Sequence, residues 1–252
     1  MNIDKQSFSD ISIFHQEEEY SIFHKLDFTR TVGGREWLRK FFSEPHDDLK
    51  KIRGTQRVIR TFMEHVKDWP TDISNGTILV MDKFLDYTLD PISEAPASLN
   101  NLTYQWLHSE DYSMLKYSVG HFADFYRGLK NIAELLEGVE LPPAIQLYID
   151  RINGILREEP MQRLADSEKG KKFSNRQNLY FGYHLRGRYK SNTLELIDIY
   201  SRLDAWYSMA VAVKTYGLSF PEFVEQDTAL VDAKGLYHIL LSKPVADDMQ
   251  MN

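Results

Sequence analysis

The chain has 252 residues, 42% of them hydrophobic, with 13 Gly and 9 Pro, which is the composition of a folded protein rather than a disordered one. It contains no cysteine, which excludes disulfides, thiolate metal sites and cysteine nucleophiles. The net charge of −7 argues against a protein that coats DNA with its whole surface. No stretch reaches the roughly 18 apolar residues of a membrane span, and the first residues lack a signal-peptide pattern, so we expect a cytoplasmic protein.

Three helices are expected in the first third of the chain. The first begins near Gly34 and ends before Pro45, and a second follows with Asp47 as its N-cap. Apolar residues recur on one side of both helices: Trp37, Leu38, Phe41 and Phe42 in the first, and Leu49, Ile52, Ile59, Phe62 and Met63 in the second. A third helix is expected over residues 75–88, before a loop at Pro91–Pro96.

A long helix is expected in the middle of the chain, because apolar residues recur there at alternating four- and three-residue steps. The series is Leu115, Val119, Phe122, Tyr126, Leu129, Ala133 and Leu136. It defines one stripe of a helix of about 25 residues, or roughly 38 Å at 1.5 Å per residue. Gly138 suits the end of this helix, and Pro142-Pro143 suits the start of an antiparallel neighbour.

A second long helix is expected to begin at Asn192, where Glu195 completes the pattern of a capping box, and to end before Gly217. Its apolar seam consists of Leu196, Ile199, Leu203, Trp206, Ala210 and Val213. Alternating residues then predict short strands at Ala229–Val231 and Leu236–Leu241. The expected fold is therefore predominantly all-α: an elongated helical bundle with two long lever helices and a short β segment at the C-terminus.

The sequence offers no template for catalysis. It has no phosphate loop of the G-x-x-x-x-G-K-[ST] type, and its eight histidines show no metal-binding spacing such as H-E-x-x-H. Ser113–Lys116 fits S-x-x-K, but it lies inside the apolar-periodic helix without the companion motifs. We therefore expect neither a catalytic nor a metal site in this chain. Long helices with sustained seams suit a stiff strut, although the same periodicity also fits an ordinary helical bundle.

Seven cations gather between residues 169 and 190, with no Asp or Glu among them. They are Lys169, Lys171, Lys172, Arg176, Arg186, Arg188 and Lys190, and they are the candidates for DNA contact. Five aromatic residues are interleaved with them: Phe173, Tyr180, Phe181, Tyr183 and Tyr189. This mixture suits phosphate contacts combined with stacking. The alternative is a solvated connection whose aromatic residues anchor it to the bundle.

The segment from Leu26 to Pro45 reads L-D-F-T-R-T-V-G-G-R-E-W-L-R-K-F-F-S-E-P. It resembles, without a gap, the opening of the core domain in the MutS family of DNA mismatch-repair proteins. There the pattern is Leu-Asp-x-Thr-x-Thr-x-x-Gly, a helix with Leu, and a closing Pro. The matching residues are Leu26, Asp27, Thr29, Thr31, Gly34, Leu38 and Pro45. The first polar residues of this motif suit a cap and turn before a helix, which is a structural role.

Two later blocks resemble the same family in the same order. Leu203–Ala210, with Tyr216-Gly217 and Pro221–Phe223, resembles the returning lever helix and its exit. Tyr237-His238 and Pro244–Asp248 resemble the entry strands of the ATPase domain.

The third block departs from the family at two positions. Ile239 stands where the family has Pro, and Asp247 where it has Asn. Val245 and Ala246 match the positions that line the adenine in the family, which makes them the candidate cofactor-binding residues of a full-length parent.

The resemblance implies a division of the chain into three parts. Residues 1–25 would be a lead-in, 26–223 the helical core and lever domain, and 224–252 the start of an ATPase domain whose phosphate loop lies beyond this sequence. Residues 166–190 stand where the family has its long DNA clamp, as a short basic connection. No mismatch-reading domain precedes Leu26, so recognition of mismatches is not implied.

The function implied is that of a non-catalytic module of a MutS-like DNA-repair ATPase. Its helices would couple ATP binding in a missing downstream domain to DNA binding. ATP and Mg²⁺ are the cofactors expected of the full-length parent, DNA its partner, a homodimer its form and the nucleoid its location, without a membrane. The alternative is a helical scaffold that binds another protein and has no DNA or nucleotide role.

Overall fold

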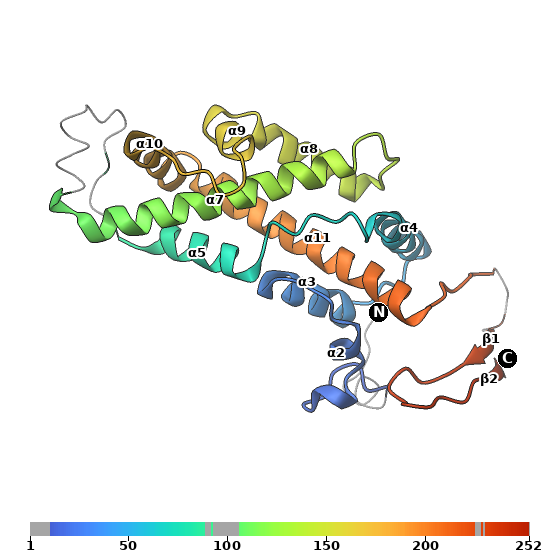
Figure 1. The fold of residues 1–252 in the computed structure, drawn as a ribbon. Coiled ribbons are helices and arrows are strands. Elements are labelled where there is room, and N and C mark those ends of the chain that lie inside the picture. Colours follow the sequence, from blue (N-terminus) through green and yellow to red (C-terminus); the bar gives the residue numbers. More distant parts are fainter. Residues whose placement is uncertain (1–10, 89–91, 93–105, 225–227, 229, 252) are drawn as a thin grey trace.

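The computed structural model describes residues 11–88, 92, 106–224, 228 and 230–251, which form a helical body followed by a β-hairpin (Figure 1). The elements are η1 (Glu18–Tyr20), α2 (Ile22–Leu26), α3 (Val32–Ser43), α4 (Leu49–His65), α5 (Asn75–Asp86), α7 (Ser109–Leu135), α8 (Pro143–Leu156), α9 (Glu159–Ala165), α10 (Asn175–Arg186), α11 (Lys190–Tyr216), β1 (Val231–Leu236) and β2 (Asp247–Met251). The predominantly helical fold with a short C-terminal β segment is thus confirmed. Among the described helices, none combines the length and the apolar character that a membrane crossing requires.

The predicted middle helix is α7, which has 27 residues, or about 40 Å of axis. Every residue of its predicted apolar series is buried, and so are Phe125 and Ile132 outside that series. The buried surface exceeds one stripe because α7 packs against α5 on one side and against α8, α9 and α10 on the other (Figure 1). The restart at Pro143 is also found, with α8 returning beside α7.

The second long helix is α11, also with 27 residues, and it lies at the centre of the body (Figure 1). It packs against α10 and α8 near its start and against α3 and α4 further along. The hydroxyl groups of Tyr126 and Thr193 lie 2.7 Å apart and join α7 to α11 inside the main core. Gly217 ends α11 with a left-handed φ of 61°, as the sequence indicated.

The apolar core has a large and a small part. The large core joins α4, α5 and α7–α11. The small core is centred on Phe23, Leu38 and Ala205, with Trp37 and Phe41 packed against it. The small core therefore attaches α2 and α3 to the second half of α11.

Two details of the predicted helices are wrong, and a third is not tested. Asp48, not Asp47, caps α4, since its Oδ1 accepts a hydrogen bond of 2.9 Å from the backbone N–H of Lys51. Asn192 and Glu195 form no capping box, because α11 begins at Lys190 and the Glu195 carboxylate instead pairs with Arg151 on α8. The loop expected at 91–96 lies outside the described residues, apart from Ile92.

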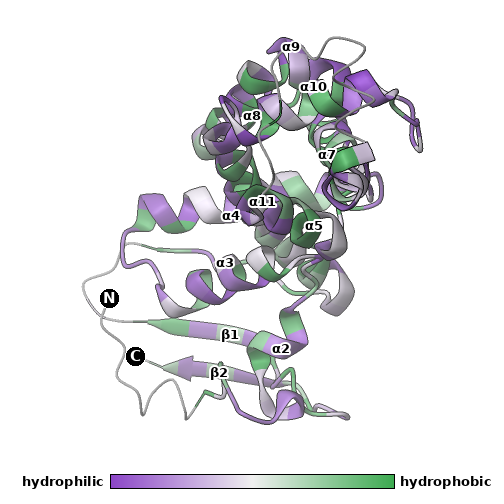
Figure 2. Cartoon of the chain, turned by 90° about the vertical axis from the view of Figure 1, so that its left-hand side faces the viewer, coloured by the Kyte–Doolittle hydropathy of each residue, from purple (hydrophilic) through white to green (hydrophobic). Residues whose placement is uncertain are grey.

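The predicted strands are also misplaced, although a β segment is present. β1 spans Val231–Leu236 and pairs antiparallel with β2 at Asp247–Met251, so residues 237–241 belong to the connection rather than to a strand. Gly235 has a φ of 63° and allows the register shift between residues 233 and 236. In both views the hairpin and α2 lie on one side of α3, and α7, α8, α9 and α10 lie on the other (Figures 1 and 2).

We predict that α11 depends on its buried seam and not on its exposed leucines. Leu196→Ala removes a fully buried side chain and should lower the free energy of unfolding by about 2–5 kcal/mol. Leu194→Ala, on the same helix but 44% exposed, is the matched control and should change it by less than about 1 kcal/mol. Urea denaturation followed by circular dichroism measures both, and equal losses would contradict the central position of α11.

Candidate functional site

The segment Leu26–Gly34, called the clamp segment below, is attached to α11 through one buried carboxylate. Asp204 on α11 has no exposed surface, and both its oxygens lie 3.0 Å from the backbone nitrogen of Arg30. Its Oδ2 also accepts hydrogen bonds from the backbone nitrogen of Thr31 at 2.9 Å and from the Thr31 hydroxyl at 2.8 Å. The first MutS-like block is therefore held by a residue of the second.

Ser208, one turn further along α11, makes a second attachment. Its hydroxyl accepts a hydrogen bond of 2.8 Å from the backbone nitrogen of Phe28 and donates one of 3.2 Å to the carbonyl of Leu26. Two polar side chains on one face of α11 thus satisfy backbone groups that precede α3 and have no helical partner.

The clamp segment also has its own cap and turn, as the sequence indicated. Oδ1 of Asp27 accepts hydrogen bonds from the backbone and hydroxyl of Thr29, at 3.0 and 2.6 Å. The Thr31 hydroxyl accepts one of 3.1 Å from the Gly34 nitrogen and is the N-cap of α3. A side chain at Gly34 would overlap the Asp204 carboxylate, so this glycine permits the close approach of α3 to α11.

Burial determines the electrostatics of the clamp. It raises the pKa of Asp204 from its ordinary value of 3.8 to about 6, while the hydrogen bonds from Thr31 and Arg30 act in the opposite direction. The carboxylate is therefore ionised for the most part at neutral pH, and its charge is held by backbone N–H groups and one hydroxyl. No ion pair at contact distance involves it among the described residues, but the positive charge of Arg30 also lowers its pKa from further away.

The seven candidate DNA-contact cations lie on and around α10, which the sequence did not predict as a helix. Three of them are occupied within the protein. Lys169 lies 3.4 Å from Asp72, the Arg186 guanidinium packs over the Phe84 ring at 5.6 Å, and Lys190 donates to the Leu85 carbonyl at 2.8 Å. These contacts attach the segment to α5 and to the chain before it.

The other four cations are exposed. Arg188 follows the end of α10 and lies over the Tyr189 ring at 5.3 Å. Lys171 and Lys172 precede α10, and Arg176 lies in its first turn. Lys171, Lys172 and Arg176, called the basic cluster below, have no carboxylate partner among the described residues. The structure thus separates the seven cations into packing residues and a small free cluster.

The interleaved aromatic residues are mostly used for packing. Phe181 and Tyr189 are buried, and Phe173, Tyr180 and Tyr183 are half-buried. The Phe173 and Phe181 rings contact edge to face at 5.2 Å, and the Tyr189 hydroxyl donates to Glu158 at 3.2 Å. These aromatic residues anchor residues 169–190 to the bundle, so they are not free to stack on bases. The basic cluster is therefore suited to contact with phosphates.

Val245 and Ala246, the candidate cofactor-binding residues, lie in the connection between β1 and β2. Val245 is 78% exposed and Ala246 is exposed as well. Neither residue lines the cleft between α7, α8 and α9 or the one between α3, α5 and α11. Nor do the described parts of the chain hold a group of three or more His, Asp or Glu side chains that could bind a metal.

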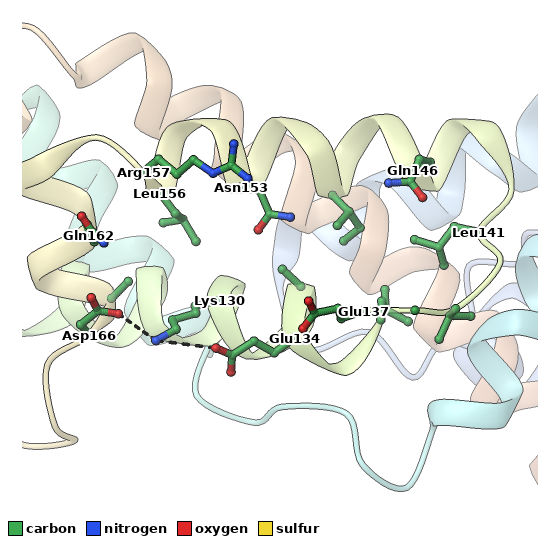
Figure 3. Close-up of a pocket in the computed structure, with 16 residues that line it drawn as sticks. Lys130, Glu134, Glu137, Leu141, Gln146, Asn153, Leu156, Arg157, Gln162 and Asp166 are labelled. Carbon is green, nitrogen blue, oxygen red and sulfur yellow. Dashed lines mark hydrogen bonds and ion pairs between the residues drawn. The ribbon is translucent and has the colours of Figure 1, made fainter.

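A polar cleft of about 420 Å³ lies between α7, α8 and α9 (Figure 3). Its one lysine, Lys130, is paired with Asp166 at 2.8 Å and with Glu134 at 3.6 Å. Because these pairs are formed within the cleft and are exposed, they suit surface stabilisation rather than the capture of a charged ligand.

Comparisons with known proteins identify no relative. No protein-family model, no curated protein and no solved structure matches the chain. The resemblance to the MutS core therefore rests on the sequence blocks themselves, two of which are in contact at Asp204.

We predict that the clamp tolerates no side chain at Gly34. Gly34→Ala should lower the free energy of unfolding by about 1–3 kcal/mol, because the new methyl group would displace the Asp204 carboxylate. Gly54→Ala on α4 is the matched control, since nothing lies within 4 Å of its added carbon, and it should be neutral or stabilising by up to about 1 kcal/mol. Thermal and urea unfolding of the two variants would test this, and a neutral Gly34→Ala would contradict the close approach.

We also predict a pH dependence that comes from Asp204. Between about pH 4 and pH 6 the folded protein keeps a proton on this group that the unfolded chain releases, so the contribution to stability is present at low pH and is lost as pH rises. The difference in unfolding free energy between the wild type and Asp204→Asn should therefore fall by about 1–3 kcal/mol across that interval. Urea titrations at a series of pH values measure it. A difference that increases with pH would mean that the hydrogen bonds outweigh burial.

Proposed function

We propose that this chain is the non-catalytic core-and-lever module of a MutS-like DNA-repair ATPase. In this proposal it couples ATP binding, in a nucleotide domain outside these residues, to DNA binding. The observation that supports it best is the clamp: the block that most resembles the MutS core is hydrogen-bonded to the block that resembles the returning lever, through Asp204 and Ser208.

The arrangement of α11 suits a lever. Its first residue, Lys190, is the last of the seven cations between residues 169 and 190. Its last residue, Tyr216, is followed by the chain that leads to the hairpin. Between these ends lie about 40 Å of helix packed by α3, α4, α8 and α10. A close-packed helix moves as a unit, because its neighbours leave no room for local compression. A displacement of one end of α11 would therefore also move the other end. Such coupling acts in both directions.

The proposal assigns separate roles to the two ends. The basic cluster would contact DNA phosphates, as an addition to whatever surface the full protein supplies. The hairpin, with Val245 and Ala246, would adjoin the nucleotide domain, where ATP and Mg²⁺ would bind. Homodimer formation and nucleoid association belong to the proposal for the full-length parent. The alternative, a scaffold that binds another protein, is favoured by an open groove between α3, α5 and α11.

We predict that replacing the basic cluster weakens DNA binding. In the triple variant Lys171→Gln, Lys172→Gln, Arg176→Gln, the affinity of the 252-residue chain for short linear and branched DNA should fall at every DNA sequence tested. Each lost phosphate contact removes about 0.9 from the slope of log affinity against log salt, so the slope should decrease by about 2 to 3. Fluorescence anisotropy over a range of salt concentrations measures both quantities.

A variant of equal charge change provides the control. Lys50→Gln, Lys51→Gln, Arg53→Gln also removes two lysines and one arginine, all exposed, from α4. It should leave both the affinity and the salt slope nearly unchanged. Equal effects of the two triple variants would show attraction by net charge alone. The absence of measurable DNA binding by the wild-type chain would remove the DNA role proposed for the cluster.

A further inference from the structure

An open groove of about 610 Å³ lies between α3, α5 and α11. Each of the three helices contributes an aliphatic side chain that is exposed to solvent. These are Val32, 58% exposed, Leu79, 51% exposed, and Leu194, 44% exposed. Three separate helices presenting aliphatic groups to one groove of this size form a surface suited to a ligand or partner rather than scattered apolar exposure.

The charges of the groove are predominantly negative. Asp198 is engaged within the protein, by Arg202 at 2.9 Å and by the Trp37 indole nitrogen at 2.9 Å. The one lysine of the groove, Lys40, lies over the Trp37 ring at 4.7 Å. Among the described residues, neither Glu36 nor Asp82 has a cationic partner. The groove thus combines an apolar lining with two free carboxylates, one on α3 and one on α5.

Asp82 is the more unusual of the two carboxylates. It is half-buried beside the aliphatic residues of α5, and burial, with a smaller contribution from the negative charge of Asp86, raises its pKa. A partly desolvated carboxylate without a counter-ion is costly, and an incoming cation would offset that cost. The environment therefore favours a positively charged ligand at this end of the groove.

We propose that this groove binds an amphipathic helix of a partner protein, with its aliphatic residues between Val32, Leu79 and Leu194 and its Lys or Arg residues against Glu36 and Asp82. Insertion of an apolar helix face into a groove between helices is a common recognition mode. The complementary charges would orient the partner and exclude acidic sequences. This inference goes beyond the proposed function and requires neither DNA nor nucleotide binding.

Other occupants fit the chemistry less well. Nucleic acid would bring phosphates toward Glu36 and Asp82 and be repelled. Residues 1–10 of this chain contain two Asp and only one Lys, so they do not offer a basic apolar face. A second copy of the chain would have to offer its basic cluster, which lies on a loop and the first turn of α10, and residues 169–190 include no exposed large hydrophobic side chain.

The groove also adjoins the clamp. Its lining includes Gly33 and Ser201, and Gly33 is followed by the glycine that packs on Asp204. A partner helix seated there would contact the start of α3 and the middle of α11 together. It would therefore strengthen the attachment that Asp204 provides.

The test uses the 252-residue chain and a fluorescent helical peptide of about 18 residues, or five turns, with leucines on one face flanked by lysines. The comparison peptide replaces every lysine with glutamate. The basic peptide should bind and the acidic one should not. The double variant Glu36→Gln, Asp82→Asn should weaken binding of the basic peptide by about fivefold to thirtyfold. Glu64→Gln, Asp68→Asn, which removes one exposed carboxylate of α4 and one of the turn after it, should leave it unchanged.

The absence of cysteine allows the position to be checked directly. A fluorophore on Leu79→Cys should respond to the basic peptide, whereas one on Leu147→Cys, at an exposed position of α8, should not. The proposal is overturned if the basic peptide does not bind, if both peptides bind equally, if the double variant binds as well as the control variant, or if only the label on α8 responds. Circular dichroism confirms that each variant is folded.

Discussion

A carboxylate enclosed by protein must be held by donors, and this requirement explains how the first part of the chain meets the last helix. Asp204 has lost contact with water, and its charge is held by two backbone N–H groups and one hydroxyl, all from Arg30 and Thr31. Leaving such a buried group without its donors costs about 1–3 kcal/mol, and more when the group is charged. The start of α3 is therefore fixed on α11 at one place and in one orientation.

Much of the remaining architecture follows from that attachment. With the start of α3 fixed, Leu38 reaches Ala205 and closes the small core, which in turn holds Phe23 of α2. The same placement sets α3 beside α5 across α11 and so forms the groove that carries Glu36 and Asp82. The positions of the small core and the groove on the lever helix α11 thus depend on the attachment at Asp204.

The long helices could be predicted from the sequence, because their apolar residues recur for many turns and Gly217 marks an end that only a left-handed residue satisfies easily. α10 was missed because its buried side includes Asn178 and Gly182, which interrupt the apolar pattern. Ser174 and Gln177 form a capping box at its start, and this was the signal that could have revealed it. The strands were misplaced because a hairpin with exposed residues on both faces has no clear alternation.

The candidate site was only partly predictable, for two physical reasons. Composition located the seven cations, but a guanidinium that packs over a ring, such as Arg186 over Phe84, has the same sequence signature as one that faces solvent. The polar motif before α3 was correctly interpreted as a cap and turn. Its hydrogen-bond partner on α11, Asp204, was not predicted. Asp204 lies between Leu203 and Ala205, which are both buried. Because a buried carboxylate needs hydrogen-bond donors, its position in an apolar part of the sequence indicated that another segment donates to it.

The most direct test of the clamp is the exchange of backbone amide hydrogens at Arg30 and Thr31, measured by NMR. If Asp204 holds both N–H groups in a buried network, they should exchange as slowly as the amides in the centre of α11, through unfolding of the whole body. Fast exchange at both positions, similar to that of an exposed loop while α11 remains protected, would show that the clamp segment is not fixed on the helix and would contradict the account.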